Sequence, residues 1–145
     1  MSWGYEAEQP SASRFIDEHE WTGTHDPAAY LTVPAAIKFC EEHHWDEVRA
    51  QCHTLVQQVR ERITELTGLP PISPDSADWY MQMVALPLPP CDPVRLKTRL
   101  YDEFKVEVPM VVWQGKPYIR VSIQAYNTQD DVDRLLDGLA QSLDA

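Results

Sequence analysis

The chain has 145 residues, 43% of them hydrophobic, and a formal net charge of -11. This length can bury one substantial core and an appended segment, but not two full domains. The acidic balance, with lysines and arginines scattered along the chain, disfavours nucleic acid because its phosphates repel such a surface. No apolar run approaches the roughly 20 residues of a membrane span, and the N-terminus is acidic and polar, unlike a signal peptide. We therefore expect a cytoplasmic protein that contacts neither nucleic acid nor membrane.

The first 26 residues predict an irregular N-terminal arm, because they show no sustained period of 2 or 3.6. The arm carries several large aromatic side chains: Trp3, Tyr5, Phe15 and Trp21. Such side chains are a poor choice for a disordered linker, so we expect the arm to pack on other polypeptide. That partner need not lie within this chain.

Two helices follow the arm. Asp26 and Pro27 form a cap and first-turn pair, and apolar residues then recur at helical spacing as far as His43. Pro34 lies inside this pattern and should kink or divide the helix, because its ring removes a backbone hydrogen bond. A second helix begins near Asp46 and ends at Gly68, and its length of roughly 33 Å would let it link two domains.

The second half of the chain mixes strands and helices. We predict a strand over 79–88, a helix from Asp92 and Pro93 to Phe104, a hairpin that turns at 114–117, and a last helix opened by Thr128 and Asp131. This order indicates an α/β (α+β) fold in which helices cover a small, mainly antiparallel sheet. We assign residues 1–45 to the arm and first helix, which belong structurally to an absent large domain, and residues 46–145 to a small C-terminal domain.

Arg120 is the first candidate for a site, because it interrupts the apolar run of the second hairpin strand. A guanidinium can bind a carboxylate through two parallel hydrogen bonds. The alternative is an outward-facing strand residue paired with a nearby acid, and spacing alone favours this alternative. The sequence around Arg120 shifts the balance toward the carboxylate-binding role.

The segment Tyr118–Leu136 resembles the C-terminal signature of class V aminotransferases: a strand with Arg and Ser, a Tyr-Asn pair, and a helix that opens with acids. Trp21–Pro27 resembles a second element of that family, a Gly-Thr turn before a helix. Trp3-Gly4-Tyr5 and Ser13-Arg14-Phe15 extend the resemblance toward the isopenicillin N epimerase-like branch. The resemblance covers essentially the whole chain and implies the C-terminal portion of a fold-type I, pyridoxal-phosphate (PLP) dependent enzyme.

The resemblance also implies roles for particular residues. Arg120 would hold the α-carboxylate of an amino-acid substrate, and Gly23 and Thr24, with His25 beside them, would reach the cofactor phosphate across a homodimer interface. Without the resemblance, the Gly-Thr segment is simply a turn. The family places the lysine that bonds to PLP upstream of this segment, and no lysine here fits that role. The chain alone should therefore lack a catalytic residue and should not hold the cofactor by itself.

Two other interpretations are weighed against these roles. A zinc site could be formed by a group of cysteines and histidines: Cys40, His43, His44, Cys52 and His53. These residues lack the closely spaced ligand pairs of zinc motifs, so we expect no metal site. We also expect Cys40, Cys52 and Cys91 to be free thiols.

The whole enzyme could catalyse epimerisation, β-elimination, desulfuration or transamination, and one arginine cannot decide among these reactions. If the chain acts on its own, it would be a noncatalytic interaction or dimerisation domain derived from the same fold.

Overall fold

The computed structural model describes residues 12–19 and 23–143, and its contacts divide the chain into two units. The first unit ends at His43, and the second begins at His44. The aromatic residues Trp3, Tyr5 and Trp21, on which the expectation of a packed arm partly depends, lie outside the described residues.

The described residues of the first unit form three helices: α1 (Arg14–His19), α2 (Ala28–Leu31) and α3 (Val33–Glu42). The short helix α1 lies within the predicted irregular arm, where Arg14 pairs with Glu18 at 2.6 Å. The predicted division at Pro34 is confirmed, since α2 and α3 are separated at Thr32 and Pro34 occupies the first turn of α3. None of these three helices has a buried residue.

The second unit opens with the long helix α4 (Trp45–Thr67). It ends where predicted, because Gly68 takes a left-handed conformation with φ 67° that a Cβ atom would disfavour. The start differs slightly from the prediction: His44 precedes the helix, and Asp46 lies within the first turn near Arg49 instead of capping it. One face of α4 is buried, through Cys52, Val56, Val59 and Ile63.

Three antiparallel strands form the sheet in the order β1-β3-β2. They are β1 (Met83–Pro87), β2 (Met110–Trp113) and β3 (Lys116–Ser122). The predicted hairpin is present, and its turn consists of Gln114 and Gly115 at φ 50° and 74°, the left-handed pair that tight hairpins favour. The strand predicted over 79–88 is shorter because residues 79 and 80 hydrogen-bond backward to Ser76 instead of pairing with β3.

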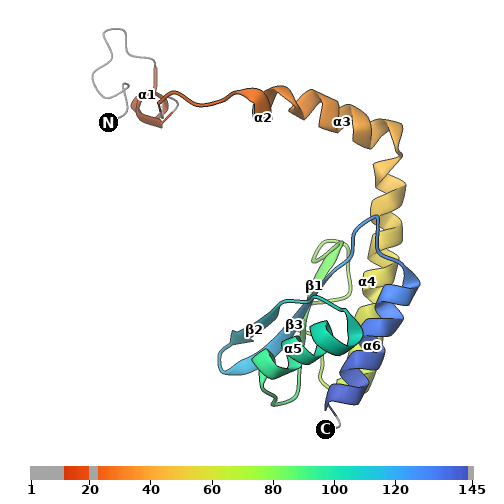
Figure 1. The fold of residues 1–145 in the computed structure, drawn as a ribbon. Helices are drawn as coiled ribbons and strands as arrows, with labels where there is room; N and C mark the ends of the chain where they lie inside the picture. Colours follow the sequence, from red (N-terminus) through yellow and green to blue (C-terminus); the bar gives the residue numbers. More distant parts are fainter. Residues whose placement is uncertain (1–11, 20–22, 144–145) are drawn as a thin grey trace. The chain divides into compact units, whose positions relative to one another are not determined.

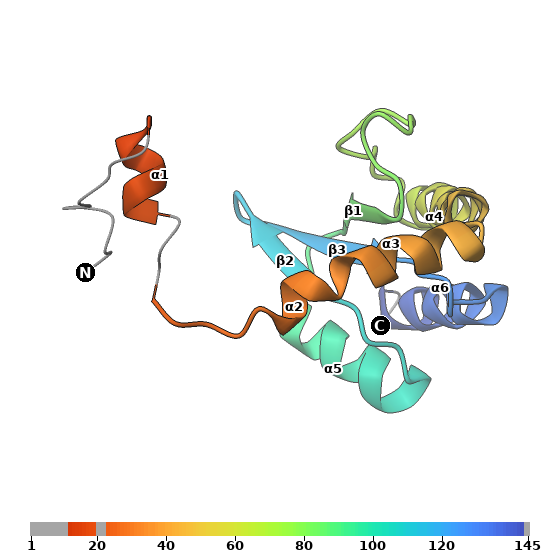
Figure 2. The ribbon, with the colours of Figure 1, turned by 90° about the horizontal axis from the view of Figure 1, so that it is seen from above.

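Helices cover one face of this sheet. α4 packs against β1 and β3, α5 (Pro93–Phe104) against β2, and α6 (Gln129–Leu143) against both α4 and α5. Figures 1 and 2 both show α4 and α6 side by side. The core between helices and sheet includes fully buried Ile63, Leu100, Ile119 and Leu139. The predicted fold class, a small antiparallel sheet covered by helices, is therefore confirmed.

Local capping explains where the later helices begin. The Asp92 carboxylate accepts hydrogen bonds from the backbone N–H groups of Val94 and Arg95, at 2.9 and 3.2 Å. At α6, the Thr128 N–H donates to the Asp131 carboxylate at 3.0 Å, as in the predicted capping box. Lys105 ends α5 in a left-handed conformation with φ 57°. Among the described residues, no helix combines the length and apolar character needed to cross a membrane.

Candidate functional site

Arg120 lies on the sheet face opposite the helices. Its neighbours Ile119 and Val121 are 0% and 3% exposed and belong to the core, so the alternation of a strand places Arg120 on the other face. It pairs with Ala85 of β1, and its N–H donates to the Pro109 carbonyl at 3.0 Å. These backbone contacts fix the position from which the exposed guanidinium projects.

Other exposed side chains share this open face of the sheet. Strand register places Met83, Val111 and Trp113 on the same side as Arg120, and these three are 52%, 43% and 55% exposed. No acidic side chain within the described residues pairs with Arg120, so the nearby acid required by the alternative interpretation is not found there. The strands themselves contain no Asp or Glu. The open face therefore combines apolar surface with a cation that is available to an anion.

The segment Gly23–His25 forms an exposed bend before α2 in the first unit. Gly23 has φ 105°, which favours glycine, and His25 Nδ1 lies 3.2 Å from the Gly23 carbonyl oxygen. The Asp26 carboxylate accepts a hydrogen bond from the Ala28 N–H at 2.9 Å. The Thr24 hydroxyl makes no hydrogen bond within the described residues, and a Cβ atom at Gly23 would meet nothing within 4 Å. This open bend can offer hydrogen-bond donors to a phosphate, as the PLP role requires.

All four lysines are exposed, as the sequence predicts. Lys38 pairs with Glu42 at 3.5 Å, and Lys105 Nζ donates to the Asp102 carbonyl at 2.7 Å. Lys97 lies on the outer side of α5, and Lys116 begins β3 rather than lying within the hairpin turn. A lysine that bonds to PLP needs an enclosed site that tunes its amine. None of these lysines has such surroundings.

The structure shows other surroundings for two of the cysteines and histidines that suggested zinc, Cys52 and His53. Within residues 12–19 and 23–143, no three potential ligands gather in a group that could hold a metal ion. Cys52 is 3% exposed and belongs to the core. His53 contacts the Tyr80 ring at 5.2 Å between centroids, and its Nδ1 lies 2.8 Å from the Met81 carbonyl oxygen. Cys40, Cys52 and Cys91 are free thiols.

A polar cluster that the sequence did not reveal fastens the segment after α4 to that helix. The Arg60 side chain is only 12% exposed, donates to the Ser73 carbonyl at 2.8 Å and lies 3.9 Å from the Asp75 carboxylate. Tyr80 donates its hydroxyl proton to Asp75, and Gln57 donates to the same carboxylate at 3.3 Å. The members lie far apart in sequence, so no short motif could have identified them.

The cluster shifts two pKa values in opposite directions. The Tyr80 hydrogen bond, followed by that from Gln57, lowers the pKa of Asp75 because both favour the carboxylate. Burial, and then the hydrogen bond to Asp75, raises the pKa of Tyr80 to about 12 because both disfavour a phenolate. At neutral pH the cluster thus consists of a charged Asp75 and a neutral Tyr80.

Comparisons with known proteins agree with the resemblance seen in the sequence. Residues 16–135 match the family model described as aminotransferase class-V. The chain is 34% identical to isopenicillin N epimerase of Amycolatopsis lactamdurans, over 97% of this chain and 38% of that protein. It is 30% identical to isopenicillin N epimerase of Streptomyces clavuligerus, over 96% of this chain and 38% of that protein. The chain therefore spans about 38% of the length of these relatives.

More distant matches extend this group. The chain is 28% identical to a probable L-cysteine desulfhydrase, chloroplastic, of Arabidopsis thaliana, over 84% of this chain and 29% of that protein. Among solved structures, 8-amino-7-oxononanoate synthase of Francisella tularensis shares the fold, with a TM-score of 0.68 at 19% identity over 90% of this chain and 38% of that one. The family-model match covers most of the chain, and the chain belongs to the aminotransferase class-V family.

Proposed function

We propose that this chain is the C-terminal part of a PLP-dependent enzyme that acts on amino acids, in which Arg120 binds the substrate α-carboxylate. The observation that carries the proposal is the exposed Arg120, without an acidic partner in the described residues, on a sheet face that helices leave open. An arginine fork suits a carboxylate because two of its N–H groups can donate in parallel. The fixed backbone of β3 would hold that fork in place for the substrate.

The proposed cofactor contact lies in the first unit. The bend at Gly23, Thr24 and His25 exposes a hydroxyl and a small residue, and we assign to it a contact with the PLP phosphate of the partner subunit in a homodimer. PLP, when bound, supplies an electron sink for the bond that breaks at the amino-acid α-carbon. The lysine for this chemistry would come from polypeptide outside this chain, because its own four lysines are exposed.

The names of the relatives support a class of reaction, chemistry on amino-acid groups, but not one particular reaction within it. Two are named for epimerisation of isopenicillin N and one for desulfhydration of L-cysteine, and both names describe chemistry on amino-acid groups. Epimerisation, transamination, desulfuration and elimination all require that the substrate α-carboxylate be bound in a fixed position. Arg120 would therefore serve each of these reactions equally. A cytoplasmic location accompanies the proposal as a prediction.

A noncatalytic interaction or dimerisation domain is the second candidate. The exposed apolar side chains on the open sheet face favour it, since such a surface suits contact with another polypeptide. The two candidates differ in one measurable respect. An enzyme would show amino-acid binding that depends on Arg120, and an interaction domain would not.

The test uses the complete PLP-loaded enzyme that carries this chain, with Arg120→Ala. Loss of a charged hydrogen-bonding partner should lower kcat/KM for the amino-acid substrate roughly 10- to 100-fold, mainly through KM. The matched control is Arg95→Ala, since Arg95 is exposed on α5. It should leave kcat/KM unchanged, and both variants should retain the native circular dichroism spectrum. Equal kinetics for Arg120→Ala and the unaltered enzyme would remove Arg120 from this role.

A further inference from the structure

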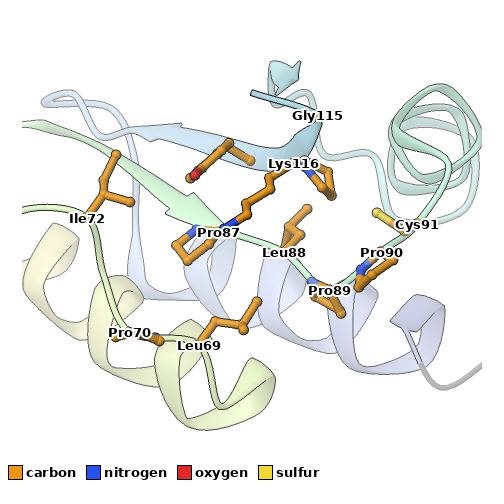
Figure 3. A pocket seen from close by; sticks show the side chains of 12 residues that line it. Leu69, Pro70, Ile72, Pro87, Leu88, Pro89, Pro90, Cys91, Gly115 and Lys116 are labelled. Atoms are coloured by element: carbon orange, nitrogen blue, oxygen red, sulfur yellow. The ribbon is translucent and has the colours of Figure 1, made fainter. Parts of the chain in front are cut away.

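A groove of about 520 Å³ opens beside the end of β1 in the second unit. Its walls come from the residues after α4, from the end of β1 and its connection to α5, and from the hairpin turn with the start of β3. Figure 3 shows side chains of these three segments, among them Leu69, Ile72, Leu88 and Pro90, around one hollow. The volume lies within the range of pockets that bind small molecules. Arg120 does not line the groove.

The groove is poor in polar groups. Five of its twelve lining residues are prolines, which have no backbone N–H to donate. Lys116 is the only charged residue among the twelve, and no carboxylate lines the groove. Its side chain extends along the hollow toward Pro87 (Figure 3). It makes no ion pair or side-chain hydrogen bond within the described residues. In a chain with a net charge of -11, this groove carries one positive charge and no negative one.

One wall of the groove is anchored before any ligand arrives. The Leu69 N–H donates to the Thr67 hydroxyl at 3.3 Å, directly after the Gly68 turn that ends α4. Four residues further on, the Ser73 carbonyl accepts the 2.8 Å hydrogen bond from Arg60. Leu69 is the first of these two attachment points, and Ile72 lies between them. The hollow is therefore held open by hydrogen bonds to α4, which lowers the ordering cost of binding.

We propose that this groove binds a small molecule with an apolar body and a terminal carboxylate. The proline and leucine walls would bury the apolar body, and the Lys116 ammonium would bind the carboxylate at the rim. A neutral molecule of the same shape would gain the first contact without the second. The proposal does not depend on the role of Arg120 or on PLP.

The test titrates the ¹⁵N-labelled chain with octanoate and, separately, with 1-octanol, and follows backbone amide shifts. Octanoate should shift the amide resonances of Leu69, Ile72, Leu88 and Gly115 at a concentration about fivefold lower than octanol requires. One partly solvated ion pair accounts for a difference in affinity of about this size. Lys116→Met keeps the apolar stem but removes the charge, and it should abolish that preference. The control Lys97→Met removes an exposed charge from α5 outside the groove and should preserve it.

Several results would overturn the proposal. One is that octanoate shifts amides elsewhere and leaves the groove unaffected. Another is that octanoate and octanol bind the unaltered chain equally. A third is that Lys116→Met retains the preference for octanoate. Lys116 is exposed at the start of β3, so the variant should fold normally, and its unperturbed amides outside the groove will show that it does.

Discussion

The two units of the chain differ most in what they bury. Every buried apolar side chain identified in the structure belongs to the second unit, whereas the helices of the first unit bury none. The first unit is not short of apolar residues, since Leu31, Val33 and Ile37 are 74%, 50% and 55% exposed. We therefore keep as a prediction that the apolar side chains of the first unit contact polypeptide outside this unit.

The difference in burial also implies that the two units are stabilised differently. The second unit closes a core between three helices and a sheet, so its residues support one another within the chain. The described residues of the first unit form helices without a core of their own, and tertiary packing supplies most helix stability in proteins. We therefore expect substitutions in the second unit to change global unfolding, and comparable substitutions in the first unit to leave it unchanged.

The largest effect should come from Leu139→Ala in α6. Leu139 is 0% exposed, so truncation leaves a cavity in the core and should lower the free energy of unfolding by about 3 kcal/mol. The matched variant is Ile37→Ala, which removes an exposed aliphatic group in the first unit and should change this energy by less than about 0.5 kcal/mol. Urea unfolding followed by circular dichroism measures both values. Equal losses would contradict the division into two kinds of unit.

A smaller change in the free energy of unfolding is expected at alkaline pH, from the polar cluster around Asp75 and Tyr80. Because the folded pKa of Tyr80 is raised to about 12, its contribution is fully present below the unfolded pKa near 10 and is lost as pH rises toward 12. The loss should be on the order of 2 kcal/mol, since one pKa unit corresponds to about 1.4 kcal/mol.

Tyr80→Phe tests this dependence, because it removes the ionising hydroxyl. The unfolding free energy of the variant should fall less between pH 10 and pH 12 than that of the unaltered chain. Tyr101→Phe is the control, since Tyr101 is 56% exposed on α5. Parallel pH profiles for Tyr80→Phe and the unaltered chain would show that folding does not raise the pKa of Tyr80.

Much of the fold could be predicted from local signals. Gly68, Asp92 and Pro34 each act through their own backbone or a neighbouring one, so the helix boundaries that they set are readable from a few residues. Alternating apolar residues likewise predicted the hairpin. The strand over 79–88 was predicted too long because Tyr80 hydrogen-bonds to Asp75 and its backbone returns to Ser76, which alternation alone does not reveal.

The candidate sites likewise differ in whether local sequence could predict them. Arg120 could be singled out because a cation in an apolar strand is locally anomalous, and its place on the open face follows from strand alternation. The groove beside β1 could not be predicted, because Ile72, Leu88 and Lys116 come from three segments that only the folded chain brings together. The role of Gly23 to His25 stays a prediction, since no described residue shows what this bend binds.

The smallest effect comes from one motif that occurs in both units. Asp26 and Asp92 each precede a proline, and each carboxylate accepts a backbone N–H hydrogen bond at 2.9 Å. Asp92→Ala should lower the free energy of unfolding by about 1 kcal/mol, because α5 is part of the core. Asp26→Ala removes the same kind of bond from α2, yet the urea midpoint should stay constant, because α2 buries nothing. If Asp26→Ala lowered that midpoint as much as Asp92→Ala, the first unit would have to share the cooperative unfolding of the second.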